Sequence, residues 1–329
     1  MNDAIKYDLE SLSNREYNRI SVGITPSNGV HFGFAFTMIS AFMYMQNHPN
    51  CSLEVCITDR DLDPQLGRIF KPYDRLEDKG DCHKLMRDHV LEELKMLRND
   101  YCTFFGLDSG RINIVFFSDL LVGEPTFFAE IKELLVNQEK SRALKVALLD
   151  HGKKPYEVPF SPICPSCEYS NSHLGYVNQH RQLASFCYKQ GCDYERTKNL
   201  VVVSIDDPKA YNLHYMIPVA RDLFDLRLSP KADLHIFGGD FDKPHGVKKF
   251  RKYERVQRVM QIFGRELPDI FIGPELELGG RKISKSTDIF FPYASGEPEF
   301  EERFLRASVK QITRNRGRDI VDLAVDMQV

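Results

Sequence analysis

Three segments of the chain carry residue types that suit nucleotide binding. The first, residues 24–34, reads Ile-Thr-Pro-Ser-Asn-Gly-Val-His-Phe-Gly-Phe and lies between a β-branched run at 20–24 and an apolar segment at 34–45. This order predicts a strand, a tight turn and a helix, and the N-terminus of a helix favours an anionic group. An ordinary strand-to-helix crossover, in which glycine and proline only shape the turn, explains the same residues equally well.

The other two segments lie in the second half of the chain. Residues 238–246 follow an apolar run and contain three glycines, two aspartates and a histidine. Such a turn can contact a ribose or a base, but it needs no ligand to form. Residues 280–287 read Gly-Arg-Lys-Ile-Ser-Lys-Ser-Thr. Lys282 and Lys285 are suited to neutralising a polyphosphate leaving group, although loops of this composition are frequent.

Four cysteines have spacing typical of a metal site. Cys164 and Cys167 form a Cys-x2-Cys pair, and Cys187 and Cys192 form a Cys-x4-Cys pair with Gly191 at a position expected to need a positive φ. Two such turns can supply four thiolates to a structural zinc, whereas four unligated cysteines in an exposed hairpin are the alternative. The remaining cysteines are expected to be free buried thiols: Cys51, Cys56, Cys82 and Cys102.

Composition limits the class of protein. The 329 residues carry a net charge of −3, with 42% hydrophobic and 28% charged residues, which argues against a surface built for bulk nucleic-acid binding. Basic residues near 248–252 and 303–318 fit either a local phosphate or RNA contact or solvated helix faces. The N-terminus lacks a signal-peptide pattern and the apolar run at 33–45 is too short for a bilayer, so we expect a cytoplasmic protein without a membrane partner.

Alternating strand and helix patterns predict an α/β fold with a parallel sheet. The strand at 200–205 is continuously apolar, as expected for burial on both faces, and acidic residues at 59–63 follow the strand at 53–58. The predicted strands are 19–24, 53–58, 111–117, 200–205, 233–237 and 269–273. The predicted helices are 1–19, 33–47, 81–106, 127–149, 211–226, 248–263 and 300–329.

Two of these segments together resemble a known family. Residues 26–33 resemble the first signature of class I aminoacyl-tRNA synthetases, and residues 282–286 resemble the second. The nearest resemblance, over residues 15–290, is to the class I (archaeal-type) lysyl-tRNA synthetase. It includes Ile24-Thr-Pro-Ser, the acidic residues 59–63, the cysteine cluster, residues 238–245 and residues 263–268.

The resemblance implies a Rossmann-type parallel sheet split by a zinc-binding insertion. The first half of the core would be residues 1–62 and the second half residues 200–291. The insertion would be residues 63–199, with a zinc-ribbon-like cluster at about 160–196, and a short basic helical tail would follow at 292–329.

The resemblance also implies a site for ATP, Mg²⁺ and an amino acid, besides a structural Zn²⁺ on the four cysteines. Its catalytic residues would be His31, Lys282 and Lys285. The ATP-binding residues would be Thr25, Pro26, Ser27, Gly29, His31, Gly33, Gly238, Gly239, Asp242, His245, Ile283, Ser284 and Ser286. The amino-acid pocket would contain Ile24, Asp59, Asp61, His214 and Tyr215.

Three departures from the family pattern affect the expected function. Phe34 stands where the family usually has a polar residue, and residues 214–217 contain no acid to pair with a lysine ammonium. Only a short segment follows Ser286, so we expect no helical anticodon-binding domain. The missing acid argues against lysine as the activated amino acid.

The expected activity is ATP-dependent formation of an aminoacyl-adenylate with release of pyrophosphate. The acceptor would be a small molecule, a peptide, a carrier protein or a tRNA used without anticodon reading. One alternative is a minimal aminoacyl-tRNA synthetase that reads only the acceptor stem. The other is a non-catalytic relative that binds an amino acid, a nucleotide or RNA.

Overall fold

The computed structural model describes most of the chain. The described residues are 4–24, 30, 32–57, 61–62, 82–116, 119–120, 123–137, 139–140, 142–143, 146–147, 160–167, 176–177, 181–187, 190–207, 210–214, 233–245, 250–264, 267–283, 298–315 and 318–327. All structural statements below concern these residues.

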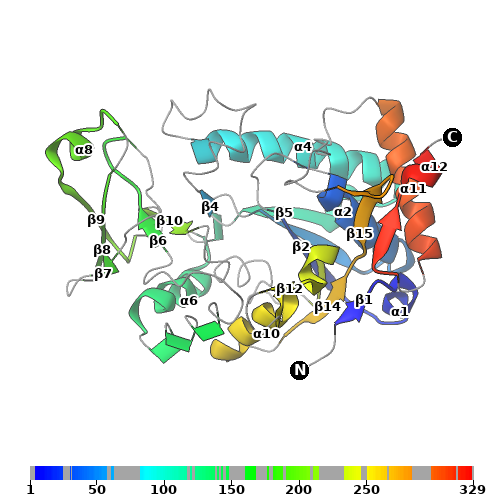
Figure 1. Cartoon of the computed structure of the whole chain (residues 1–329), viewed down its shortest axis with the longest axis horizontal. Coiled ribbons are helices and arrows are strands. Elements are labelled where there is room, and N and C mark those ends of the chain that lie inside the picture. The colour runs from blue at the N-terminus through cyan, green and yellow to red at the C-terminus, as the bar shows by residue number, and fades with distance from the viewer. Residues whose placement is uncertain are drawn as a thin grey trace.

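A six-stranded parallel sheet forms the centre of the molecule, which confirms the predicted parallel α/β fold (Figure 1). In spatial order its strands are β1 (Ile5–Lys6), β14 (Asp269–Ile272), β11 (Leu234–Phe237), β2 (Arg19–Ile24), β3 (Ser52–Ile57) and β5 (Ile112–Phe116). The order reverses direction between β2 and β11, as in a doubly wound sheet.

Strand register separates two faces of the sheet. Ile20 and Val22 of β2 belong to the main hydrophobic core, whereas Ser21 between them is buried on the opposite face. The Ser21 hydroxyl lies 2.6 Å from Nδ1 of the buried His235 on β11. A buried polar pair of this kind must be matched in register, because a slip by one residue would leave both groups in an apolar core.

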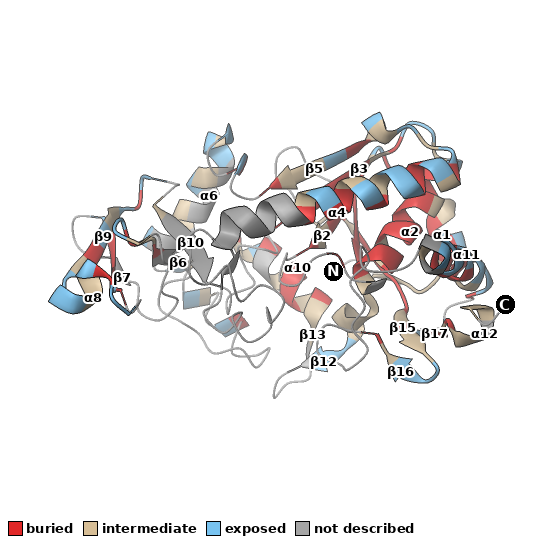
Figure 2. Ribbon diagram, turned by 90° about the horizontal axis from the view of Figure 1, so that it is seen from above, coloured by how far each residue is buried: buried red, intermediate tan, exposed pale blue. Residues whose placement is uncertain are grey.

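Four helices cover the face that carries Ile20 and Val22. They are α1 (Leu9–Ser13), α2 (Phe32–Asn47), α4 (Cys82–Phe105) and α11 (Pro298–Arg314). Helix α2 is apolar over nearly its whole length and lies buried beneath α4, whose exposed side faces outward (Figure 2). Helix α10 (Lys252–Ile262) lies on the opposite side of the sheet from α4 (Figure 1).

Smaller sheets surround this core. Strands β4 (Asp61–Leu62), β10 (Tyr211–His214) and β6 (Phe160–Pro162) form one, and β7 (Tyr176–Val177), β8 (Gln182–Phe186) and β9 (Leu200–Ser204) form a second at one end of the molecule (Figure 1). The third contains β15 (Glu275–Leu278), β16 (Arg281–Lys282) and β17 (Ile320–Asp322). The other elements are η3 (Ser109–Arg111), α6 (Pro125–Val136), α8 (Asp193–Thr197), η4 (Gly239–Asp242), β12 (Pro244–His245), β13 (Phe250–Arg251) and α12 (Ala324–Met327).

The prediction of an N-terminal helix over residues 1–19 is wrong in part, because among the described residues of this range only 9–13 are helical. Ile5 and Lys6 instead extend the edge of the central sheet beside β14. The predicted helix 127–149 is interrupted rather than continuous. It ends at Val136, where Asn137 is extended and its side chain accepts the Lys140 N–H as an N-cap, and the described residues 139–140, 142–143 and 146–147 are helical again.

Three further segments differ from prediction. Strand β9 is not buried on both faces, because it pairs with β8 in the small antiparallel sheet. Residues 211–214 form a strand rather than the start of a helix, since they pair with β4 and β6. Residues 250–251 are also a strand, so α10 begins later than predicted.

The C-terminal segment is part of the core rather than an appended helix. Phe304, Leu305 and Ile312 of α11 are buried against the main core, as are Val321 and Leu323. The predicted helix over 300–329 therefore ends at Arg314, where the chain turns into β17 beside β15. Several basic side chains of this segment pair with acids of the same segment, Arg306 with Glu302 and Lys310 with Asp326.

Among the described helices, none combines the length and apolar character needed to cross a membrane. Cys51, Cys56 and Cys102 are buried and form no disulfide, as predicted, and the side chain of Cys82 lies outside the description.

The contact between α4 and α11 generates a prediction about pH. Burial and the neighbouring Asp100 raise the pKa of Glu301 to about 7. Its folded-state pKa lies above that of the unfolded chain, so Glu301 reduces stability as pH rises from about 4.5 to 7. We expect Glu301→Gln to stabilise the protein by roughly 1 kcal/mol at pH 8, given partial solvent screening, and to have little effect near pH 4.5.

Urea unfolding at several pH values measures this effect. Glu299→Gln is the matched control, since Glu299 is an exposed acid on the same helix. Equal responses of the two variants at pH 8 would contradict the assignment.

Candidate functional site

The strand order reverses between β2 and β11, so a ligand crevice is expected beside the carboxyl ends of these two strands. In parallel sheets, ligands bind outside the carboxyl ends of the strands where the order reverses, which here is between these two strands. The chain leaves β2 towards α2 and leaves β11 at Gly238. A Cβ built on Gly238 would lie 3.8 Å from Oγ1 of Thr37 on α2, so the two exits face each other.

Part of the first predicted motif lies at this crevice. Ile24 is buried at the end of β2, and Gly33 lies in the first turn of α2, where its carbonyl accepts the Thr37 hydroxyl at 3.1 Å. Phe34 is buried in the main core, which explains an apolar residue at this position. Thr25, Pro26, Ser27, Gly29 and His31 lie outside the described residues.

Sequence reasoning missed Glu93 of α4. Its carboxylate is buried and accepts the backbone N–H of Val30 at 2.5 Å, so α4 fixes the chain just before α2 begins. The signal available in the sequence was an acid on the apolar stripe of Val90, Leu94 and Leu97. A buried carboxylate needs such a partner, because its desolvation is otherwise costly.

The two glycines of the second motif have different environments. A Cβ on Gly239 would lie 2.5 Å from the backbone nitrogen of Glu275 and 2.8 Å from the carbonyl carbon of Pro274, so only glycine fits. A Cβ on Gly238 would make only ordinary contacts, the nearest at 3.5 Å to Asp240. Gly239 therefore packs against the chain leaving β14, whereas Gly238 lies at the switch point with space for a Cβ.

The acids of this turn hold it in place. Asp242 accepts the Tyr7 hydroxyl at 2.5 Å and pairs with Lys6 at 2.8 Å and Arg251 at 3.3 Å. Burial and Asp242 raise the pKa of Tyr7 above its ordinary value, which keeps its hydroxyl protonated as a donor. Asp242 was predicted to contact ATP, and its described contacts are structural. His245 follows in β12, and its side chain lies outside the description.

The hairpin of β15 and β16 positions Lys282. Gly279 and Gly280 form its turn with φ of +62° and +72°, which strongly favours glycine. Their N–H groups donate to Asp322 at 2.8 and 2.9 Å, so the C-terminal segment fixes the turn.

The end of the hairpin leads towards the remaining motif residues. The buried Ile283 follows Lys282 and donates its N–H to the Leu276 carbonyl at 2.9 Å. Ser284, Lys285 and Ser286 lie outside the described residues.

A shared carboxylate joins the turn to the hairpin. Glu275 lies 2.5 Å from Lys282 Nζ through Oε1 and also pairs with Lys243 through Oε2. Burial alone would raise the pKa of Glu275, but the two lysines lower it. The hydrogen bond to Glu275 raises the pKa of Lys243, so the Glu275 carboxylate and the Lys243 ammonium group both remain charged near neutral pH.

The predicted amino-acid pocket is described in part. Asp61 lies on β4 and His214 on β10, and the register pairs Asp61 with Leu213 and His214 with Leu62. The two predicted pocket positions are therefore on neighbouring parallel strands, although their side chains are not described. Asp59 and Tyr215 lie outside the described residues.

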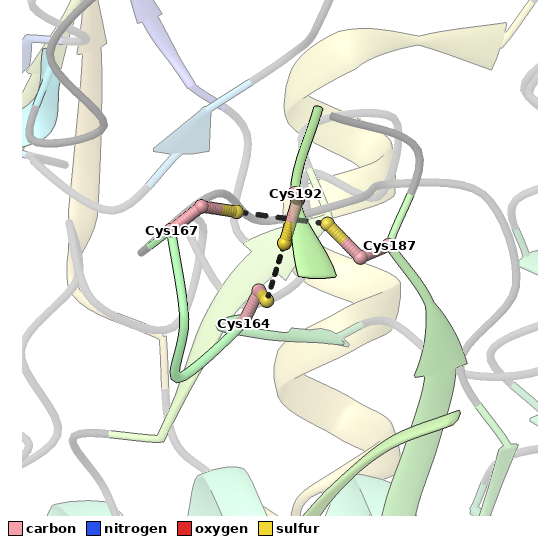
Figure 3. A group of neighbouring side chains, drawn as sticks. All are labelled: Cys164, Cys167, Cys187 and Cys192. Atoms are coloured by element: carbon pink, nitrogen blue, oxygen red, sulfur yellow. Dashed lines mark hydrogen bonds between the residues drawn. The ribbon is translucent and has the colours of Figure 1, made fainter. Parts of the chain in front are cut away.

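The four predicted metal ligands converge on one point (Figure 3). Their sulfur atoms all lie within 4.8 Å of one another, with 3.7 Å between Cys164 and Cys192 and 3.6 Å between Cys167 and Cys187. The first pair lies in the turn after β6, Cys187 follows β8 directly, and Cys192 precedes α8. Gly191 has a φ of +83°, as predicted.

This cluster has the chemistry of a structural zinc site. Burial alone would raise the pKa of Cys192, but hydrogen bonds from the Tyr194 N–H and neighbouring side chains lower it to about 6, which favours a thiolate at neutral pH. Cys164, Cys187 and Cys192 are buried with Val201 as the core of the β7–β9 module. Four thiolates fit tetrahedral zinc, and so small a core needs such a crosslink.

We predict that alanine substitutions of the two adjacent glycines differ in their effect on stability. Gly239→Ala should destabilise the fold by about 1–3 kcal/mol, because its methyl group would overlap the backbone at Glu275. Gly238→Ala should change stability by less than about 0.5 kcal/mol, because the methyl group meets no close contact. Urea unfolding of both variants checks this. Equal losses would show that the turn does not pack as described.

We also predict that the cysteine cluster binds about one zinc ion per chain. Cys164→Ser should lose the metal and lower the melting temperature of the β7–β9 module, as should a chelator. Cys51→Ala is the control, since Cys51 is a buried free thiol away from the cluster. Metal analysis with thermal unfolding tests this. A metal-free protein with unchanged stability in chelator would refute the site.

No family model matches the sequence, and neither does any curated protein. Among solved structures, similarity is found to tyrosyl-tRNA synthetase of Archaeoglobus fulgidus with L-tyrosine (15% identity, TM-score 0.43, 90% of this chain and 67% of that one). Tyrosyl-tRNA synthetase of Leishmania major with tyrosinol is similar at 13% identity and TM-score 0.40, over 86% of this chain and 31% of that one. Methionyl-tRNA synthetase of Mycobacterium tuberculosis with methionyl-adenylate is similar at 11% identity and TM-score 0.45, over 94% of this chain and 67% of that one.

Proposed function

We propose that this protein uses ATP to activate an amino acid as an aminoacyl-adenylate and then passes the aminoacyl group to an acceptor. The proposal rests on the sequence resemblance to class I aminoacyl-tRNA synthetases and on one structural observation. The turn after β11 and the hairpin that carries Lys282 meet through Glu275 beside the switch point of the sheet. Two of the motifs that resemble the family are thereby brought to one edge.

The proposed reaction needs positioning and charge more than acid–base catalysis. An amino-acid carboxylate oxygen attacks the α-phosphorus of ATP, and the bond from that phosphorus to the pyrophosphate oxygen breaks. Lys282 and Lys285 would hold the β- and γ-phosphates with Mg²⁺ while negative charge moves onto pyrophosphate. His31 would stabilise the pentavalent phosphorus, and Gly29 and Gly33 would lie against the ATP.

We place the ribose and adenine on the side of Gly238, the glycine whose Cβ position is open. Asp242 and His245 belong to the same turn. Asp242 already accepts a hydrogen bond from the Tyr7 hydroxyl and forms ion pairs with Lys6 and Arg251. We therefore propose that it acts mainly by holding the turn in place.

The amino acid would occupy the neighbourhood of Ile24, Asp59, Asp61, His214 and Tyr215. The pairing of β4 with β10 supports this placement, because it brings two of these positions together. We do not expect lysine, since residues 214–217 offer no acid for a second ammonium group. The acceptor would be a small molecule, a peptide, a carrier protein or a tRNA acceptor stem.

Two other functions make different predictions. A minimal aminoacyl-tRNA synthetase would charge bulk tRNA with the activated amino acid. A non-catalytic protein would bind an amino acid or nucleotide without turnover. Arg306 pairs with Glu302 and Lys310 pairs with Asp326, both in the same C-terminal segment. These two positive charges are therefore largely neutralised within the protein, which argues against RNA binding at these positions.

Amino-acid-dependent ATP–pyrophosphate exchange, screened over all amino acids, tests the proposal. We expect exchange with one or a few amino acids, and Lys285→Ala should lower it about a hundredfold or more because a charge on the leaving group is lost. Lys95→Ala is the control, since Lys95 is an exposed α4 residue paired with Glu92. Silence with every amino acid, or undiminished exchange in Lys285→Ala, would contradict the proposal.

A further inference from the structure

We propose that Lys243 is a further polyphosphate-binding residue, forming with Lys282 a two-ammonium site whose geometry is set by Glu275. Lys243 lies in the turn 238–246, outside the two signature segments 26–33 and 282–286, and was not among the predicted site residues. The inference rests on the proposed function for the identity of the ligand, which would be the β- and γ-phosphates of ATP. The anion site itself rests on the described contacts alone.

Lys243 and Lys282 meet at one buried carboxylate. Lys243 comes from the turn after β11, and Lys282 comes from β16, yet they occupy the two oxygens of one carboxylate. The Glu275 side chain is only 11% exposed, whereas those of Lys243 and Lys282 are 47% and 32% exposed. The carboxylate is therefore the buried base of the cluster, and both ammonium groups extend from it towards solvent.

The charges of these three side chains favour an anion. Two ammonium groups share one carboxylate, so this triad carries an excess positive charge. An ammonium group has three N–H donors, and its pair with Glu275 does not use them all. Lys243 can thus keep its contact with Glu275 and donate to a phosphate oxygen at the same time.

The contacts around Lys243 fix its backbone. Gly239 packs directly on the backbone of Pro274 and Glu275, and Asp242, next to Lys243, is fixed by Lys6, Tyr7 and Arg251. A side chain that is already ordered loses less entropy on binding a ligand than a free lysine does. The turn begins at the carboxyl end of β11, beside the switch point, where a nucleotide is expected.

A purely structural role for Lys243 is the competing explanation. In that case the ion pair would only fasten the turn to the hairpin, and its loss would lower stability without changing anion affinity. Lys252 provides a matched comparison, because it pairs with Asp240 of the same turn but has no contact with Glu275 among the described contacts. Removing it subtracts the same charge from the same region.

The test is calorimetric titration of the full-length protein with tripolyphosphate and, separately, with AMP. We expect Lys243→Met to weaken tripolyphosphate binding about tenfold, the effect of losing one charge-assisted hydrogen bond, and to leave AMP binding unchanged. Lys243→Arg, which keeps the charge, should retain most of the affinity. Lys252→Met should bind like the unsubstituted protein. Thermal unfolding of each variant confirms that it is folded.

Three results would overturn the inference. They are no tripolyphosphate binding by the unsubstituted protein, unchanged affinity in Lys243→Met, or an equal loss in Lys252→Met. ATP–pyrophosphate exchange assays distinguish a failure of the Lys243 anion site from a failure of the proposed function. Loss of tripolyphosphate affinity in Lys243→Met without any amino-acid-dependent exchange would support the anion site and refute the activity. Exchange with an unchanged KM for ATP in Lys243→Met would support the activity and refute the role of Lys243.

Discussion

The arrangement of the candidate site depends on the contact between the chain leaving β11 and the chain leaving β14. Gly239 lies so close to the backbone of Pro274 and Glu275 that no larger residue fits, and Glu275 then binds a lysine from each side. Without this contact, the turn and the hairpin would be separate loops on one edge of the sheet. With it, their charged side chains form one cluster beside the switch point.

Both ends of the described chain support this contact. Lys6 and Tyr7, at the edge of the sheet, hold Asp242 of the turn. Asp322, near the other end, accepts hydrogen bonds from the two glycine N–H groups of the hairpin turn. Burial alone would raise the pKa of Asp322, but the hydrogen bonds from the N–H groups of Ala324, Gly279 and Gly280 lower it. The packing of α11 and β17 into the core therefore has a consequence for the site, because it fixes the strand that carries Lys282.

The parts of the fold that sequence predicts well are those with strong local patterns. Strand β2 matches its predicted range of 19–24, and α2 and α4 agree within a residue or so, because long apolar or amphipathic runs dominate their neighbourhoods. The two-residue strand β1 was not predictable, because it forms only by pairing with β14, more than 200 residues later in the chain. The carboxylate that Glu275 shares between two lysines was not predictable either, because it depends on how the turn and the hairpin pack together. The spacing of the four cysteines was enough to predict their convergence, whereas the different roles of Gly238 and Gly239 required the packing around them.

A crystal structure of the protein with ATP and Mg²⁺ tests the central claim most directly, that the turn after β11 and the Lys282 hairpin together form a nucleotide site. We expect the ribose and adenine beside Gly238 and α2, with the β- and γ-phosphates within hydrogen-bonding distance of Lys282 and Lys243. ATP bound elsewhere, or bound at this edge with its phosphates directed away from both lysines, would contradict it.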